Sequence, residues 1–257
     1  MTNLWTPNVL KIYRALNGQM RLVGGCVRDF LLDQKPADID MATPLSPDDI
    51  RDRLTAAGIK SHLIAPRHGL TEIILDNERF EITTLRTDSY DTGRQKITFI
   101  TDYQADARRR DFTINALSMD REKVYDYFGG ESDLKSNRVR FIGDAATRLW
   151  EDPLRIFRYI RFWAAFGGDK PDSDILSLFP KHRDKLSQVS LNRRKKEFSK
   201  ILMGPRSLTA LDLMRSSGLF PYIVCRDGLD DLKNLLSINS NPTYQDRLLC
   251  FNNYIKI

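Results

Sequence analysis

Cysteine is scarce in this sequence, which has three among its 257 residues. Cys26, Cys225 and Cys250 are far apart and form no CxxC pair, so neither a zinc site nor a disulfide framework is expected. Long apolar runs are also missing. Charged and polar residues interrupt every apolar stretch near the N-terminus, unlike a signal peptide, and no run could cross a bilayer. These absences predict a soluble, cytoplasmic protein with no membrane partner.

The charge balance is basic, with a net charge of +6 at pH 7 and a pI near 9.2. This balance favours an acidic partner such as nucleic acid, although many basic proteins bind none and the distribution of charge matters more than its sum. The apolar fraction of 41% is sufficient for a core. The length allows one large domain or two small ones.

The stretch LVGGCVRD, from Leu22 to Asp29, predicts a strand that breaks at a glycine pair and opens a helix. Two adjacent glycines, Gly24 and Gly25, let the backbone approach a ligand closely. The free N–H groups at the start of a helix suit a phosphate. Arg28 falls on the first turn, where it can add a charge-assisted bond to an anion.

Two aspartates follow in the phrase Asp38-Ile39-Asp40. Side chains alternate on a strand, so Asp38 and Asp40 are expected on one face and Ile39 in the core. Magnesium prefers oxygen ligands and is usually held by one or two carboxylates plus substrate phosphates. Each motif alone is common in turns and on surfaces, but the two in this order predict a Mg²⁺-dependent nucleotide enzyme.

These residues resemble the signature of the class II tRNA nucleotidyltransferases, the CCA-adding enzymes, and of the related bacterial poly(A) polymerases. The resemblance extends from about Leu22 to about Phe220. It implies an α+β fold, with a polymerase-β-like nucleotidyltransferase head built on a mixed sheet of about five strands. An all-α part follows. The expected domains are a catalytic head (1–137), a helical neck that binds base and RNA (138–204) and a truncated helical body (205–257).

Glu81 lies in a strand-like phrase between apolar Phe80 and Ile82, so it faces away from them. It is either an exposed strand residue or a third carboxylate beside the aspartate pair. The resemblance favours the second reading, with a catalytic role that includes support. The following stretch, 86–107, has weak periodicity and turn-forming residues near Gly93, so it is expected to be a functional loop. In family terms it matches a flexible loop, which implies an enzyme able to add the final adenosine.

The phrase RRRDFTINAL, from Arg108 to Leu117, predicts a helix on which Asp111 and Asn115 share one face. A carboxylate and an amide placed in this way could bind ribose hydroxyls, and Arg110 could meet the triphosphate. A capped amphipathic helix is the alternative. The string closely resembles the family's ribose-reading motif, and recognition of the 2′-OH would select ribonucleotides.

A helix is predicted from about Pro153, with Asp152, Arg155, Arg158 and Arg161 at steps of three residues. A solvated basic face would explain this row, but its order resembles the family's template motif. That resemblance implies that Asp152 and Arg155 bind the Watson–Crick edge of CTP or ATP. Carboxylate acceptors and guanidinium donors complement both bases. Arg158 and Arg161 would complete the nucleotide site through phosphate or helix positioning.

The stretch from Ser190 to Leu202 resembles the family's last motif, with Ser190 as a helix N-cap. Its cluster of basic side chains is as consistent with RNA contact as with a solvated face. The residues expected to bind RNA are Arg193, Arg194, Lys195 and Lys196. Family members usually continue into body and tail domains, so the C-terminal part is shortened by that standard.

The predicted reaction is attack of an RNA 3′-hydroxyl on the α-phosphate of CTP or ATP, with release of pyrophosphate. Asp38 and Asp40 are the expected Mg²⁺ ligands, and Gly25 is expected to help cradle the triphosphate with Arg28. The expected partners are the 3′ end and acceptor stem of tRNA, CTP and ATP, with the protein a monomer or weak dimer. The alternatives are an enzyme that adds only the adenosine, a poly(A) polymerase and a catalytically silent RNA-binding protein.

Overall fold

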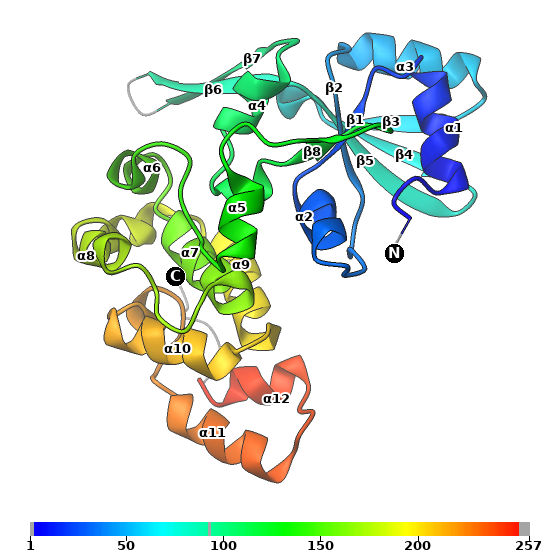
Figure 1. The fold of residues 1–257 in the computed structure, drawn as a ribbon. Helices are drawn as coiled ribbons and strands as arrows, with labels where there is room; N and C mark the ends of the chain where they lie inside the picture. The colour runs from blue at the N-terminus through cyan, green and yellow to red at the C-terminus, as the bar shows by residue number, and fades with distance from the viewer. Residues whose placement is uncertain (1–2, 92–93, 252–257) are drawn as a thin grey trace. The chain divides into compact units, whose positions relative to one another are not determined.

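The structure, a computed structural model, describes residues 3–91 and 94–251. The chain divides into two compact units, Met1–Lys135 and Ser136–Ile257. Figure 1 shows that the first unit contains the strands and that the second is helical in its described residues.

The first unit contains helices and strands in a mixed order. They are α1 (Pro7–Ala15), β1 (Arg21–Val23), α2 (Gly25–Leu31), β2 (Asp40–Thr43), α3 (Pro47–Ala56), β3 (Lys60–Ala65), η1 (Pro66–His68), β4 (Leu70–Leu75), β5 (Glu78–Thr84), β6 (Arg86–Asp91), β7 (Arg94–Phe99), α4 (Tyr103–Arg108), η2 (Thr113–Asn115), β8 (Ser118–Met119), β9 (Val124–Tyr125) and α5 (Gly130–Lys135).

The main sheet has seven strands in the order β3-β4-β5-β2-β1-β8-β9. The sequence predicted about five, and the two short strands β8 and β9 account for the difference. Strands β2 and β5 are parallel, whereas the other neighbouring pairs are antiparallel. The sheet is therefore mixed, as predicted, and its one parallel pair sets two distant parts of the chain side by side.

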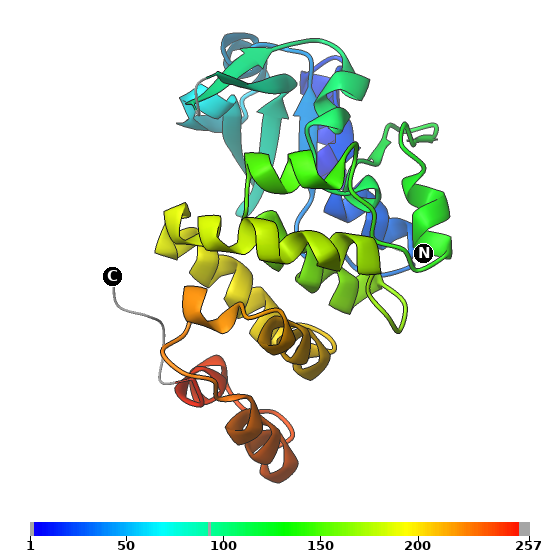
Figure 2. The same cartoon turned by 90° about the vertical axis from the view of Figure 1, so that its left-hand side faces the viewer.

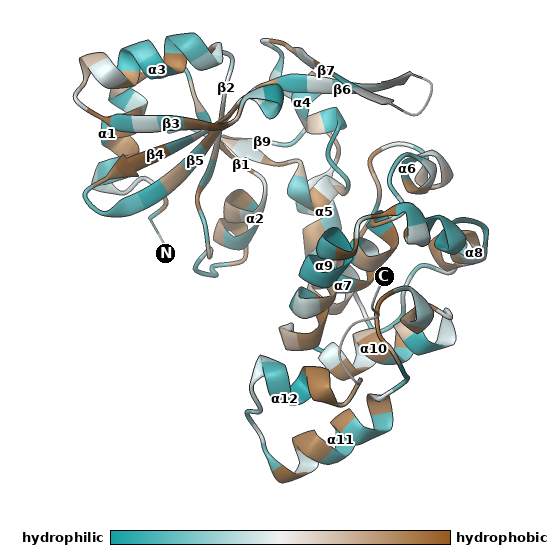
Figure 3. Ribbon diagram, turned by 180° about the vertical axis from the view of Figure 1, so that it is seen from behind, coloured by the Kyte–Doolittle hydropathy of each residue, from teal (hydrophilic) through white to brown (hydrophobic). Residues whose placement is uncertain are grey.

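Local sequence signals explain the helices beside the sheet. The hydroxyl of Thr6 accepts from the Val9 N–H at the start of α1, and that of Ser46 accepts from Asp49 at the start of α3. Proline follows each cap at the first helical position, where its missing N–H costs nothing. In Figure 3, apolar segments run through β4 and β5, while α3 is largely hydrophilic.

Strands β6 and β7 form a two-stranded antiparallel hairpin, so the prediction of a structureless stretch over 86–107 was wrong. Residues 96–99 and the start of α4 continue this ordered structure. The predicted turn residues Thr92 and Gly93 lie outside the described residues.

The second unit is built from helices in all its described regular elements. They are α6 (Ala145–Glu151), α7 (Arg155–Phe166), α8 (Ser173–His182), η3 (Arg183–Gln188), α9 (Leu191–Met203), α10 (Ser207–Ser216), η4 (Phe220–Tyr222), α11 (Leu229–Ile238) and α12 (Tyr244–Leu249). Helix α7 packs on α9 and α10 (Figure 2). Helix α12 packs on α9, and helix α11 packs on α10.

The core of the second unit lies under α7, α9 and α10. Phe157 and Ile160 of α7 and Phe198 of α9 are fully buried. Arg206 stabilises the end of α7, because its guanidinium donates to the carbonyl oxygens of Trp163 and Ala164. The division of this helical part into a neck and a body remains a prediction. Within the described residues, no helix is both long and apolar enough to span a bilayer.

Candidate active site

Asp40 and Glu81 lie side by side on the parallel strands β2 and β5, where they are paired in register. Adjacent strands are about 4.8 Å apart, so the two carboxylates share one end of the sheet. Asp38 is exposed and precedes the strand, because β2 begins at Asp40 and not at Asp38 as predicted. Ile39, expected in the core, is only half-buried.

The three carboxylates interact electrostatically. Loss of solvation raises the pKa of Asp40, and Asp38 adds to the rise, whereas the Arg110 guanidinium opposes it. Loss of solvation also raises the pKa of Glu81, with further contributions from Asp40 and Asp38. Asp38 therefore makes Asp40 harder to ionise, and both aspartates make Glu81 harder to ionise, which is the condition that a bound cation relieves.

A cavity of about 410 Å³ opens beside these carboxylates within the first unit. Asp40 and Glu81 line one part of it, and Arg86, Arg109 and Arg110 line another. Opposite charges therefore face the same space. Such a lining suits a ligand that carries phosphates together with a cation.

Of the predicted glycine pair, Gly24 is the residue for which only glycine fits the turn before α2. Its φ is +76°, and a Cβ added there would lie 2.6 Å from a terminal guanidinium nitrogen of Arg110. Gly25 has no such restriction, because a Cβ added there would lie 3.5 Å from a guanidinium nitrogen of Arg28, which is an ordinary contact. Gly24 thus lets the guanidinium of Arg110 lie directly against the backbone.

Arg28, Asn115 and Asp111 form one hydrogen-bonded chain. Arg28 donates to the side-chain oxygen of Asn115 at 2.6 Å, and the Asn115 amide donates to Asp111 at 3.2 Å. The predicted helix is instead an extended Phe112 followed by the single 3-10 turn η2. The turn still brings Asp111 and Asn115 together, so the predicted proximity is present without the predicted helix.

Asp106 is a buried carboxylate that sequence reasoning missed. It accepts from Arg109 Nε at 2.9 Å and from the backbone N–H of Arg86 at 3.1 Å, and lies 3.7 Å from Arg110. Asp106 therefore contacts all three arginines that line the cavity. Asp106 lies on α4, four residues before Arg110, and this spacing could have indicated their ion pair from the sequence.

Magnesium is compatible with this donor set. Within the described residues no group of three or more His, Cys, Asp or Glu side chains is arranged to hold a metal ion by itself. Exposed Asp38 and Asp40 leave room for substrate oxygens to complete the ligand shell. The residues present therefore fit a divalent ion that binds together with a triphosphate.

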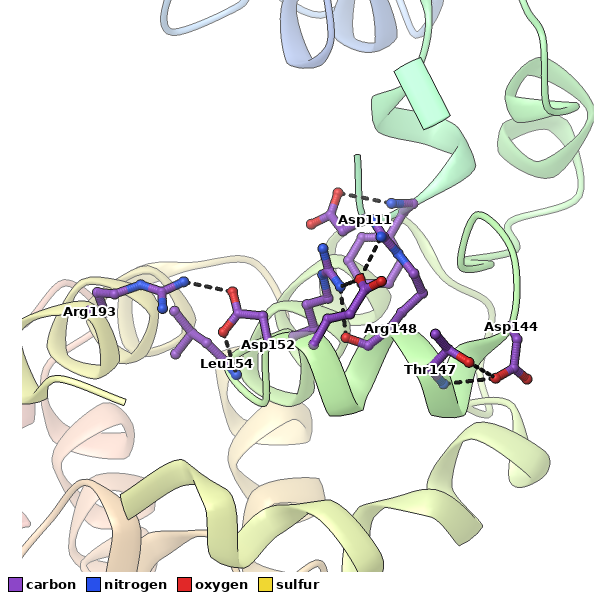
Figure 4. Close-up of polar contacts among 10 residues, drawn as sticks. Asp111, Asp144, Thr147, Arg148, Asp152, Leu154 and Arg193 are labelled. Atoms are coloured by element: carbon purple, nitrogen blue, oxygen red, sulfur yellow. Dashed lines mark hydrogen bonds and ion pairs between the residues drawn. The ribbon is translucent and has the colours of Figure 1, made fainter. Parts of the chain in front are cut away.

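In the second unit, Asp152 lies outside α7, contrary to the prediction of one helix carrying the whole row of charges. Helix α7 begins at Arg155, and Asp152 caps the preceding turn by accepting from the Leu154 N–H at 3.2 Å. Its other oxygen accepts from Arg193 at 2.6 Å (Figure 4). Arg155 is buried and donates to Glu151 at 2.8 Å.

Arg158 and Arg161 both donate to Glu197 of α9, at 3.1 and 2.8 Å. Glu197 is buried and was missed by sequence reasoning, because it stands in a run of basic residues. One signal was present, since Glu197 immediately precedes a core phenylalanine on an amphipathic helix. The two arginines therefore connect α7 to α9.

Helix α9 presents only part of its predicted basic surface to solvent. Arg194, predicted to bind RNA, is 2% exposed and donates to the Tyr222 carbonyl. That burial contradicts a surface role. Arg193 and Lys196 are exposed, and Lys195 is half-buried. Ser190 is the N-cap residue as predicted, but its side chain makes no capping hydrogen bond.

Two family models match the chain. Residues 20–140 match the poly(A) polymerase head domain. Residues 170–226 match a domain described as a probable RNA and SrmB-binding site of polymerase A. The first match contains the carboxylates, the glycine turn and the Asp111–Asn115 turn, and the second contains α9.

Curated relatives include two proteins from distant organisms. The human mitochondrial CCA tRNA nucleotidyltransferase 1 is 39% identical over 213 residues, which cover 80% of this chain and 49% of the human protein. A CCA-adding enzyme of Geobacillus sp. (strain WCH70) is 36% identical over 216 residues, covering 82% and 52%. The chain thus spans about half the length of the curated relatives it matches.

A solved relative has the same fold. The crystal structure of the Bacillus stearothermophilus CCA-adding enzyme in complex with CTP superposes with a TM-score of 0.78 and 30% identity. The match covers 91% of this chain and 57% of that enzyme. By its sequence, its head fold and its match to both family models, the chain belongs to the tRNA nucleotidyltransferase and poly(A) polymerase family.

Proposed function

We propose that this chain adds nucleotides from CTP and ATP to the 3′ end of tRNA without a nucleic-acid template, completing the CCA end. One observation carries the proposal. Asp40 and Glu81 are paired in register at the edge of a cavity that Arg110 also lines. Carboxylates and guanidiniums around one space suit phosphoryl transfer, in which positioning and charge stabilisation supply most of the catalysis.

The triphosphate site is assigned to the turn at Gly24 and Gly25 with Arg28 and Arg110. Arg110 lies against the glycine backbone and is held by the Asn115 carbonyl and by Asp106. Its guanidinium is thus fixed before substrate arrives, so little reorganisation accompanies binding. Arg28 is buried at the start of α2 and adds a second cation.

Ribose recognition is assigned to Asp111 and Asn115. Both are buried, and the hydrogen bond between them fixes the amide orientation. Asp111 also accepts from the Phe112 N–H at 2.9 Å. A carboxylate held in this way retains acceptor capacity for a ribose hydroxyl.

Base recognition is assigned to Asp152 and Arg155. Their backbones are joined by a turn in which the Arg155 N–H donates to the Asp152 carbonyl at 3.0 Å. Glu151 fixes Arg155 and Arg193 fixes Asp152, so both side chains are oriented by partners on the same unit. Acceptor and donor groups of this kind complement cytosine and adenine and mismatch guanine.

Asp38 and Asp40 are the proposed ligands of Mg²⁺. When bound, the ion supplies charge stabilisation at the triphosphate and lowers the pKa of a coordinated hydroxyl. Glu81 lies next to Asp40 and orients that strand end rather than acting as a ligand. The human relative is described as mitochondrial, so a cytoplasmic location for this chain stays a prediction.

The proposal is tested with Mg²⁺, CTP, ATP and three tRNA transcripts that end before CCA, after C and after CC. Addition of CCA to the first transcript is the expected result. Addition of adenosine only to the CC-ended transcript would indicate an A-adding enzyme, and long A-tails a poly(A) polymerase. Lack of incorporation on all three transcripts would contradict the proposal and favour a silent RNA-binding protein.

A further inference from the structure

Trp150 is an open aromatic surface on the last turn of α6. Its exposed fraction is 57%, although tryptophan is usually buried for most of its area. The other residues of that turn are engaged, since Leu149 is fully buried and Arg148 pairs with Glu151 at 2.6 Å. Because Leu149 faces the core at this turn, the indole of the next residue, Trp150, faces outward.

A cation lies over this ring. The ammonium of Lys185, in η3, is 5.0 Å from the Trp150 ring centroid. A single exposed apolar side chain needs no explanation, but an aromatic face beside a lysine is the combination that binds single-stranded nucleic acid. Lys181, four residues earlier, is also exposed. The carboxylate of Asp184 is engaged by the Tyr222 hydroxyl.

The position of Trp150 relative to the proposed base-reading residues is fixed by two hydrogen bonds to one backbone carbonyl. The Asp152 N–H donates to the Arg148 carbonyl at 3.3 Å, and Arg155 donates to the same carbonyl at 2.7 Å. Trp150 lies between these residues in the chain. A base stacked on its indole would therefore be held at a constant offset from Asp152 and Arg155.

We propose that Trp150 and Lys185 form a stacking platform for an unpaired nucleotide of the RNA acceptor end, with the indole against the base and the ammonium at its phosphate. This inference rests on the proposed function and adds a contact for the RNA instead of the incoming nucleotide. Lys185 lies within the region matched by the probable RNA-binding family model, residues 170–226. Stacking accepts any base, so the platform adds affinity and position without sequence choice.

The test compares two RNA hairpins of equal stem, one with an unpaired CC 3′ overhang and one blunt, by equilibrium binding without nucleotide. The wild-type chain is expected to bind the overhang RNA about tenfold more tightly. Trp150→Ala should abolish this preference, and Trp150→Phe should retain most of it. Leu249→Ala is the matched control, because Leu249 is 58% exposed on α12. A preference that persists in Trp150→Ala would overturn the proposal.

Kinetics separate this proposal from the function on which it rests. Trp150→Ala should raise the KM for RNA about tenfold and leave the KM for CTP unchanged. A rise in the KM for CTP alone would contradict a platform for RNA. If the wild-type chain incorporates no nucleotide, the proposed function fails, whereas the overhang preference in the binding assay still decides whether the platform exists.

Discussion

Asp152 accepts a hydrogen bond from Arg193 at 2.6 Å, and this ion pair joins the turn before α7 to the first turn of α9. A residue predicted to read the base and one predicted to bind RNA are thus partners. The consequence is that Arg193 orients Asp152. Because the Arg193 guanidinium is already paired with a carboxylate, it is less able to neutralise an RNA phosphate.

Arg193→Met tests this orientation. The change removes the donor but keeps a long apolar stem, so Asp152 loses its fixed rotamer. We expect kcat/KM for CTP to fall about tenfold, which is the size of one charge-assisted hydrogen bond, while the affinity for RNA changes little. Lys196→Met is the control, since Lys196 is an exposed basic residue of the same helix. An effect on RNA affinity alone would assign Arg193 to phosphate contact.

Asp38→Ala and Asp40→Ala test the proposed metal ligands. Each should lower nucleotide incorporation at least 10³-fold, because the charge stabilisation that a divalent ion gives is lost with its ligand. The far-UV circular dichroism spectrum should be unchanged. Asp48→Ala on α3 is the control, as Asp48 is an exposed acidic residue of the same unit. Near-normal transfer by either variant would contradict the metal assignment.

Glu197→Gln tests the carboxylate that bridges Arg158 and Arg161. Removing its charge leaves two guanidiniums without their buried partner, and breaking such a pair costs about 3 kcal/mol. The thermal unfolding temperature of the helical part should fall clearly. The matched change is Asp212→Asn, which weakens a half-exposed pair with Lys233 and should shift it little. Equal falls in the unfolding temperature of the two variants would show that burial of the ion pair does not determine its contribution to stability.

Arg194→Met should stabilise the protein. Arg194 is almost fully buried, burial lowers the pKa of its guanidinium, and its Nε has no hydrogen-bond partner among the described residues. A methionine of similar length removes the desolvation cost at the loss of one bond to the Tyr222 carbonyl. The expected gain in unfolding free energy is about 1 kcal/mol, measured by urea unfolding. A destabilised variant would show that the single carbonyl bond outweighs desolvation.

Cys26 should resist alkylation. Burial raises its pKa from 9.0 to about 11, so at pH 8 the reactive thiolate is a very small fraction. Cys225 is exposed and should react first. Peptide mass spectrometry after iodoacetamide treatment at pH 8 measures both sites. Rapid modification of Cys26 in the folded protein would contradict a closed packing of α2 against the sheet.

The sequence predicted those helices and strands whose ends are marked by strong local signals. Strand β1 and helix α2 were expected over Leu22–Asp29, because the glycine pair marks where the strand ends and the helix begins. The hairpin of β6 and β7 was not expected. Its residues 86–91 are mostly polar, so no period-two apolar pattern is present in the sequence.

The candidate site was predictable where spacing alone decides proximity, and not where folding adds partners. A separation of four residues brings Asp111 and Asn115 together in a 3-10 turn as it would in a helix. No spacing rule connects Glu197 to Arg158 across 39 residues, or reveals that Arg194 faces inward. Long-range pairing and burial depend on how α7 and α9 pack, which one sequence does not display.

The parallel pairing of β2 with β5 also constrains the order in which the site assembles. In sequence, Asp40 and Glu81 are separated by α3, β3 and β4. Antiparallel neighbours can form from a hairpin, but a parallel pair needs its whole crossover in place. The two carboxylates are therefore not brought together until this crossover is in place. A divalent ion that relieves the repulsion between them would bind only after this pairing has formed, and it would stabilise only chains in which the two strands are already paired.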